Sequence, residues 1–288
     1  MKLYMSIKSV LFTISGICLS VLLLMGVSLY HQINDVSYYS DIIQYLARIG
    51  QDVLVRHTIA ELLLDALILF TICRNSWRIY KQWFLTRKWR QYFSQRIHWE
   101  KTYLYNRKYR RWNTEIVIIR DPTFVAITMG LLQPKIILST GALELLNQSE
   151  QRAVILHEVY HCQGKDTLKH FLIYLVEYGL MYIPVIKQLA EYYRARTEIL
   201  ADRFSIDQTG ASSGLSSALL KVLRTQNNGQ LAKVGINFTE SAINYRIMQL
   251  LDLDNPVRIP VKVHWKPMVY SILVMLSILL VVTVNCTT

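Results

Sequence analysis

The chain has 288 residues, an apolar fraction of 52%, a formal net charge of +12 and a mean hydropathy of +0.23. These values argue against an ordinary soluble protein, and the length allows one large domain or two small ones. The four cysteines, Cys18, Cys73, Cys162 and Cys286, have no spacing typical of a disulfide framework or a Cys-type metal site. This cysteine pattern fits a reducing compartment.

Three apolar runs predict membrane spans. Residues 10–29 carry no charge and are long enough to cross about 30 Å of hydrocarbon. Residues 57–73 are interrupted only by Glu61 and Asp65, and residues 268–284 are again uncharged. The first run is too long for an ordinary signal-peptide core and no A-x-A-like cleavage site follows it, which disfavours a signal peptide.

Segment 74–112 is dense in Lys, Arg and aromatic residues, and Glu100 is its only acidic residue. The positive-inside rule therefore places the N-terminus and residues 74–265 in the cytoplasm, and residues 31–56 and the C-terminal tail outside. The position directly after a span favours an interfacial helix on anionic membrane lipids. Direct nucleic-acid binding, the other reading of a basic and aromatic segment, is not expected.

A small β-sheet is predicted next. Residues 115–120, 123–128 and 135–139 are short apolar runs separated by Pro, Gly and polar residues. The edge of this sheet could bind an extended peptide by strand addition, or the sheet could simply support a neighbouring helix. The pattern becomes helical from Gly141, and Ser149 marks a helix start.

The run His157-Glu158-Val-Tyr-His161 carries the clearest chemical signal. Positions i and i+4 lie on one face of a helix, so the two imidazoles can share one Zn²⁺ at about 2.0–2.1 Å per nitrogen. Glu158 lies beside the first ligand and can act as general base on a water. The motif indicates a metal-dependent hydrolase.

A catalytic zinc site needs a third protein ligand. Thr167 stands where the metzincin pattern requires a histidine, so that class is excluded. Glu198, on a helix expected over about residues 187–207, is the predicted third ligand, and Asp202 one turn later can accept the second ring N–H of a ligand histidine. This donor set describes a gluzincin. The alternative is an ordinary pair of helix histidines with a solvated acidic face at 198–202.

Three residues are candidate stabilisers of the oxyanion that forms during peptide hydrolysis: Arg246, Tyr245 and Tyr192. Asp166 is expected to cap a helix or pair locally rather than to bind metal. The apolar run 171–186 is expected to be one buried or membrane-apposed helix. A single span there would place Glu198 across the bilayer from His157.

Several segments together resemble the BlaR/MecR-type integral-membrane zinc metallopeptidases: Gly-Leu-Leu-Gln-Pro-Lys-Ile-Ile-Leu at 130–138, Gly-Ala-Leu-Glu-Leu-Leu at 141–146, the His157–His161 motif, Asp166, and Glu198-x-x-Ala-Asp202. The resemblance implies zinc held by His157, His161 and Glu198, with Glu158 as base. It also implies a bacterial cell-membrane protein that cleaves itself or a cytosolic transcriptional repressor, for example a winged-helix repressor, in signal transduction.

The prediction is a mainly α membrane protein with a cytosolic α+β gluzincin domain, whose small sheet packs on the active-site helices. Its parts are an N-terminal membrane region (1–73), a zinc metallopeptidase domain (74–265), and a C-terminal transmembrane helix with a short outer tail (266–288). We expect no extracellular penicillin-binding sensor domain, so a separate sensor protein, self-association, the outer loop or the membrane would supply the signal. The alternatives are an HtpX/CAAX-type protease in quality control or processing, and a non-catalytic receptor or scaffold.

Overall fold

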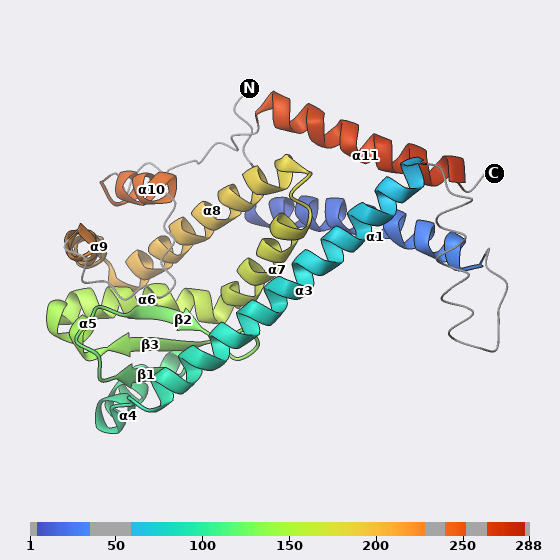
Figure 1. Ribbon diagram of the computed structural model, residues 1–288. Coiled ribbons are helices and arrows are strands. Elements are labelled where there is room, and N and C mark those ends of the chain that lie inside the picture. Colours follow the sequence, from blue (N-terminus) through green and yellow to red (C-terminus); the bar gives the residue numbers. More distant parts are fainter. Residues whose placement is uncertain (1–4, 35–58, 228–239, 252–263, 286–288) are drawn as a thin grey trace. The chain divides into compact units, whose positions relative to one another are not determined.

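A computed structural model describes residues 5–34, 59–227, 240–251 and 264–285 (Figure 1). The chain divides into two compact units. Unit 1 comprises Met1–Ile7, Gln82–Tyr174 and Glu191–Pro260, and unit 2 comprises Lys8–Lys81, Leu175–Ala190 and Val261–Thr288. Three helices are divided between the two units: α3 (Ile59–Ser94), α7 (Asp166–Gly179) and α8 (Pro184–Thr209), and a fourth, α1 (Ile7–Asn34), has only its first residue in unit 1.

Unit 2 is built around the helices α1 (Ile7–Asn34) and α11 (Trp265–Asn285). Its apolar core joins Val21 of α1, Ile68 of α3 and Ile278 of α11. Among the described residues, two segments are long and apolar enough to cross a membrane, Ile7–Gln32 and Trp265–Thr283. They coincide with the first and third predicted spans.

The second predicted span, 57–73, begins outside the described residues and continues as the first part of α3. We expected an interfacial helix directly after residue 73, and in the structure the residues after this point continue α3 without a break to Ser94. It contains no Pro or Gly that would break it. Asp65, in its apolar part, has a polar partner, because Gln32 Nε2 donates a hydrogen bond to Asp65 Oδ1 at 2.9 Å.

The apolar run 171–186, expected as one helix, is divided between two. Helix α7 ends at Gly179 and α8 begins at Pro184. Proline has no N–H to donate and a φ angle that suits the first position of a helix, so Pro184 starts a new helix rather than continuing the old one.

The predicted sheet is confirmed. Strands β1 (Ile116–Ile119), β2 (Ala126–Met129) and β3 (Lys135–Ser139) form one sheet in the order β1-β3-β2. Strand β1 is parallel to β3, and β2 is antiparallel to it. The central position of β3 leaves β1 and β2 as the two edges.

The outer edge of β1 is covered by α4 (Trp99–Lys108) and the residue before it. His98 N donates to Ile118 O at 2.7 Å, Thr102 Oγ1 accepts from Ile118 N at 3.0 Å, and Asn106 Oδ1 accepts from Ile116 N at 3.0 Å. Side chains thus take the place of a fourth strand and close this edge.

The outer edge of β2 has no such cover within the described part of the chain. Ser139 N donates to Val125 O at 2.9 Å, which makes this a hydrogen-bonded pair. Hydrogen-bonded and non-hydrogen-bonded pairs alternate in an antiparallel ladder, so the backbone groups of Ala126 and Thr128 face away from β3. Strand β2 is therefore the open edge.

Unit 1 also contains the helices η1 (Arg110–Trp112), α5 (Thr140–Leu145), α6 (Gln148–Gly164), α9 (Ser213–Asn227) and α10 (Glu240–Leu251). Helix α6 packs against β2, β3 and α9 (Figure 1). It begins with a capping box, in which Asn147 and Glu150 each accept a hydrogen bond from the other's backbone N–H. The mainly helical fold with a small supporting sheet agrees with the predicted fold class.

Candidate metal centre and active site

His157 and His161 project from one face of α6, as the four-residue spacing predicts. Their Nε2 atoms are 3.1 Å apart and their ring planes are inclined by 75°. Both residues are buried, with exposed fractions of 6% and 8%. The helix alone brings two imidazole nitrogens to one point.

Glu198 reaches the same point from α8. Its carboxylate oxygens lie 3.4 Å from His157 Nε2 and 3.6 Å from His161 Nε2. In a tetrahedral zinc site with bonds of about 2.0–2.1 Å, neighbouring ligand atoms are about 3.3 Å apart. The 3.1 Å separation of the two Nε2 atoms is close to that value, and each Nε2 has one Glu198 oxygen at a similar distance, Oε2 for His157 and Oε1 for His161. Two imidazoles with one carboxylate form a donor set typical of catalytic zinc.

A carboxylate lies beside the second nitrogen of each histidine. Asp202 Oδ1 is 2.8 Å from His157 Nδ1, although the direction of this contact falls short of hydrogen-bond geometry. Asp166 Oδ2 is 3.0 Å from His161 Nδ1. Contacts of this kind fix the ring orientation and leave Nε2 for the metal. Burial alone would lower the pKa of His157, but Asp202 and Glu198 outweigh it and raise that pKa to about 9.

A tight turn between α6 and α7 brings Asp166 back to His161. Helix α6 ends at Gly164, Lys165 adopts a left-handed conformation with φ of 49°, and Asp166 begins α7. A Cβ atom on Gly164 would lie 2.8 Å from the Asp166 carboxylate, so the glycine leaves room for the return to His161. We expected a local partner for Asp166, and its partners are this ligand histidine and Lys169, whose Nζ lies 3.4 Å from Asp166 Oδ1.

Arg246 enters the site from α10 and is buried. Its Nε and Nη2 donate to the two oxygens of Asp202 at 2.7 and 2.8 Å. Its Nη1 donates to Glu198 Oε2 at 3.2 Å. Burial opposes the charged form of the guanidinium, but the two carboxylates outweigh burial and raise the pKa of Arg246 above its ordinary value.

The other two candidate oxyanion stabilisers lie differently. The hydroxyl of Tyr192 donates to the backbone oxygen of Met5 at 2.6 Å. Tyr245 neighbours Arg246 on α10 and is partly exposed. Of the three candidates, Arg246 is the one that contacts the carboxylates of the centre.

Glu158 lies next to the paired histidines and is held by the sheet. Thr128 Oγ1 donates to Glu158 Oε2 at 2.8 Å and is 3.1 Å from the backbone oxygen of the same residue. Sequence reasoning missed Thr128, because nothing in a strand residue 30 positions upstream marks it as a partner of the motif.

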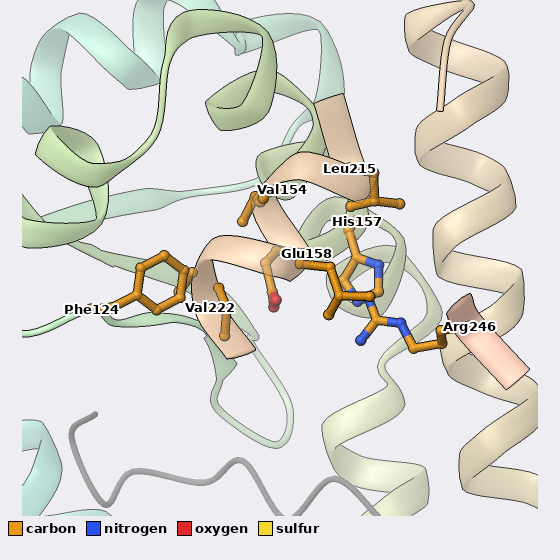
Figure 2. Close-up of a pocket in the computed structure, with 10 residues that line it drawn as sticks. Phe124, Val154, His157, Glu158, Leu215, Val222 and Arg246 are labelled. Carbon is orange, nitrogen blue, oxygen red and sulfur yellow. The ribbon is translucent and has the colours of Figure 1, made fainter. Parts of the chain in front are cut away.

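A pocket of about 60 Å³ opens beside this glutamate. Figure 2 shows Glu158, His157 and Arg246 around it, together with apolar side chains from the sheet and from α6 and α9. The apolar lining consists of Phe124, Ala126, Val154, Leu215, Ala218, Leu219 and Val222. The pocket thus joins the reactive groups to a space suited to an apolar side chain.

Comparison with known proteins gives two matches. A family model described as BlaR1 peptidase M56 matches residues 53–250. Regulatory protein BlaR1 of Bacillus licheniformis is 29% identical over 93 residues, which cover 32% of this chain and 15% of that protein. The matched family is the one that residues 130–202 resemble, and its match contains the sheet, the histidine pair, Glu198 and Arg246.

Proposed function

The chain belongs to the BlaR1 peptidase M56 family of zinc peptidases, and from this premise we propose that it is a membrane-bound zinc metalloendopeptidase that cleaves a cytosolic protein. The observation that carries the proposal is the convergence of His157, His161 and Glu198 within 4.8 Å of one another, with Glu158 beside them. Two helices of unit 1 supply these four side chains.

In this proposal Glu158 is the general base, and His157, His161 and Glu198 are the zinc ligands. Zinc held there would polarise the substrate carbonyl and make a water more acidic. The Glu158 carboxylate takes the proton of the attacking water and passes it to the leaving amine. Thr128 keeps one carboxylate oxygen in place through its 2.8 Å hydrogen bond, and Asp202 and Asp166 orient the two imidazoles.

The substrate is proposed to bind as an extended strand. The open edge of β2 offers the backbone groups of Ala126 and Thr128, which can pair with a peptide by strand addition. Thr128 belongs to that edge and also contacts Glu158, so a peptide paired there would lie near the base. The pocket beside Glu158 would hold an apolar side chain of the same peptide.

The biological role is proposed to be signal transduction, with a transcriptional repressor or the chain itself as substrate. Family membership and a relative named as a regulatory protein support this role. The proposed organisation places the peptidase domain, residues 74–265, in the cytoplasm between the membrane region 1–73 and the C-terminal helix 266–288. The basic segment after residue 73 supports that topology, which requires residues 57–73 to cross the membrane in addition to the two candidate spans Ile7–Gln32 and Trp265–Thr283.

The test compares the intact chain with the Glu158→Gln variant in lipid nanodiscs. The wild type should bind about one zinc per chain and cleave a repressor-type partner, while the variant keeps zinc and loses cleavage by roughly 100-fold or more. Retained cleavage in the variant would refute the assignment of the base. Preferential cleavage of misfolded membrane proteins would instead favour a quality-control protease. Unaltered signalling by the variant would favour a scaffold.

A further inference from the structure

The guanidinium of Arg246 makes three hydrogen bonds to two carboxylates of the metal centre. It donates hydrogen bonds to both oxygens of Asp202, at 2.7 and 2.8 Å, and to one oxygen of Glu198 at 3.2 Å. The two-pronged contact fixes the plane of the Asp202 carboxylate, which a point charge cannot do, and the third hydrogen bond restrains one oxygen of Glu198. The side chain of Arg246 is only 5% exposed, so water competes little for these contacts.

Asp202 depends on this partner. Its side chain is fully buried, with an exposed fraction of 0%, and it makes polar contacts with His157 and Arg246. A buried carboxylate that loses its cation carries a large desolvation cost, which favours its movement away from the buried position. That movement would leave the ring of His157 without its partner, and Glu198 would lose its own hydrogen bond to Arg246 at the same time.

We propose that Arg246 is a positioning residue that sets the affinity and the coordination geometry of the metal centre, by fixing Glu198 directly and His157 through Asp202. The inference rests on the proposed function, because it takes these residues as the zinc ligands. Its consequence is that the centre is completed by α10, a third helix that supplies no ligand itself.

The charge of Arg246 and its positioning role predict opposite changes in zinc affinity when the side chain is removed. As a cation 3.2 Å from a ligand oxygen, Arg246 repels a divalent metal, so its removal would strengthen zinc binding if only charge mattered. As a positioning group it pre-arranges the ligands, so its removal would weaken binding. Outer partners of metal ligands typically change affinity by about 10–100-fold, and we expect the positioning effect to dominate because Asp202 is fully buried.

Arg203 provides a matched control within the same pair of helices. It lies on α8 and its Nε donates to Gln249 Oε1 on α10 at 3.2 Å, so it also joins these two helices. Among the described residues, Arg203 makes no hydrogen bond or ion pair with Glu198 or Asp202. Replacing it tests the docking of α10 without touching the metal-site carboxylates.

The experiment is a titration of the full chain in nanodiscs with zinc against a competing chelator, and with Co²⁺, whose visible absorption reports ligand geometry. We expect Arg246→Met to weaken zinc binding by about 10–100-fold and to change the cobalt spectrum. Arg246→Lys keeps the charge but cannot make the two-pronged contact, so its zinc affinity should lie between those of the wild type and Arg246→Met. The zinc affinity of Arg203→Met should match that of the wild type.

Unchanged or tighter zinc binding in Arg246→Met, with an unchanged cobalt spectrum, would overturn the inference. A loss of zinc affinity in Arg203→Met equal to that in Arg246→Met would also overturn the inference, because the loss would then result from disturbed packing of α10 on α8. If Arg246→Met does not fold, Arg246→Lys decides, and wild-type affinity in that variant contradicts the inference. A wild type that binds no zinc would instead refute the proposed function.

Discussion

Thr128 on β2 donates a 2.8 Å hydrogen bond to Oε2 of Glu158 on α6, so the open strand of the sheet holds the proposed general base. Replacing Thr128 with valine keeps the shape of the side chain and removes the donor. We expect kcat for peptide cleavage to fall by roughly 10-fold, because the carboxylate is no longer fixed, while the zinc content stays at the wild-type level. Steady-state cleavage and metal analysis of the same preparation measure both quantities.

Thr128→Ser is the control for that substitution. Serine restores the hydroxyl without the methyl group, so we expect it to recover most of the lost kcat. If the valine and serine variants reduce kcat equally, the contribution of Thr128 to kcat does not come from its hydrogen bond.

The pocket beside Glu158 should select substrates by the size of an apolar side chain. Val222 of α9 lines it (Figure 2), and Val222→Phe would fill much of its volume of about 60 Å³. We expect kcat/KM for peptides with a large apolar residue next to the scissile bond to fall about 10–100-fold relative to peptides with alanine there. A set of matched peptides measures this ratio.

Leu220→Phe is the control on the same helix, because Leu220 is 55% exposed and does not line the pocket. It should leave the peptide preference unchanged. An unaltered preference in Val222→Phe would mean that the substrate side chain lies elsewhere.

Glu150 joins the start of α6 to α9 and should make stability depend on pH. Burial would raise its pKa, but hydrogen bonds from Lys221, Ser217 and the backbone of Asn147 outweigh burial and hold that pKa below its ordinary value of 4.5. The ionised form therefore favours the folded protein. Its contribution is complete above pH 4.5 and disappears as the pH falls through the lower folded-state pKa.

We accordingly expect Glu150→Gln to lower the free energy of unfolding by about 1–3 kcal/mol at neutral pH, with the difference shrinking in acid. Thermal unfolding followed by circular dichroism at several pH values measures it. Glu144→Gln, at an exposed glutamate of α5, should have no comparable effect. A difference from the wild type that does not change with pH would contradict this explanation.

The parts of the site that local periodicity determines could be predicted from the sequence. The spacing of His157 and His161 places them on one helix face whatever the rest of the fold does. Short apolar runs between Pro and Gly identified the three strands. Glu198 was found because a second helix with an acidic pair was needed to complete the donor set.

Contacts between distant segments could not be predicted in the same way. Arg246 is 44 residues from Asp202, and their pairing depends on how α10 packs against α8. The break before Pro184 was visible as a proline, but the apolar composition of the run suggested a single helix. The continuity of α3 through residue 74 was also missed, because a change from apolar to basic residues alters the environment of a helix without ending it.

Zinc K-edge X-ray absorption of the intact chain tests the central claim most directly, namely that two histidines of α6 and Glu198 of α8 hold a catalytic zinc. The account predicts imidazole nitrogens and carboxylate oxygen at about 2.0–2.1 Å with no sulfur at about 2.3 Å, and loss of bound zinc in Glu198→Ala. A sulfur ligand in the first shell, or an unchanged spectrum and full zinc content in that variant, would contradict it.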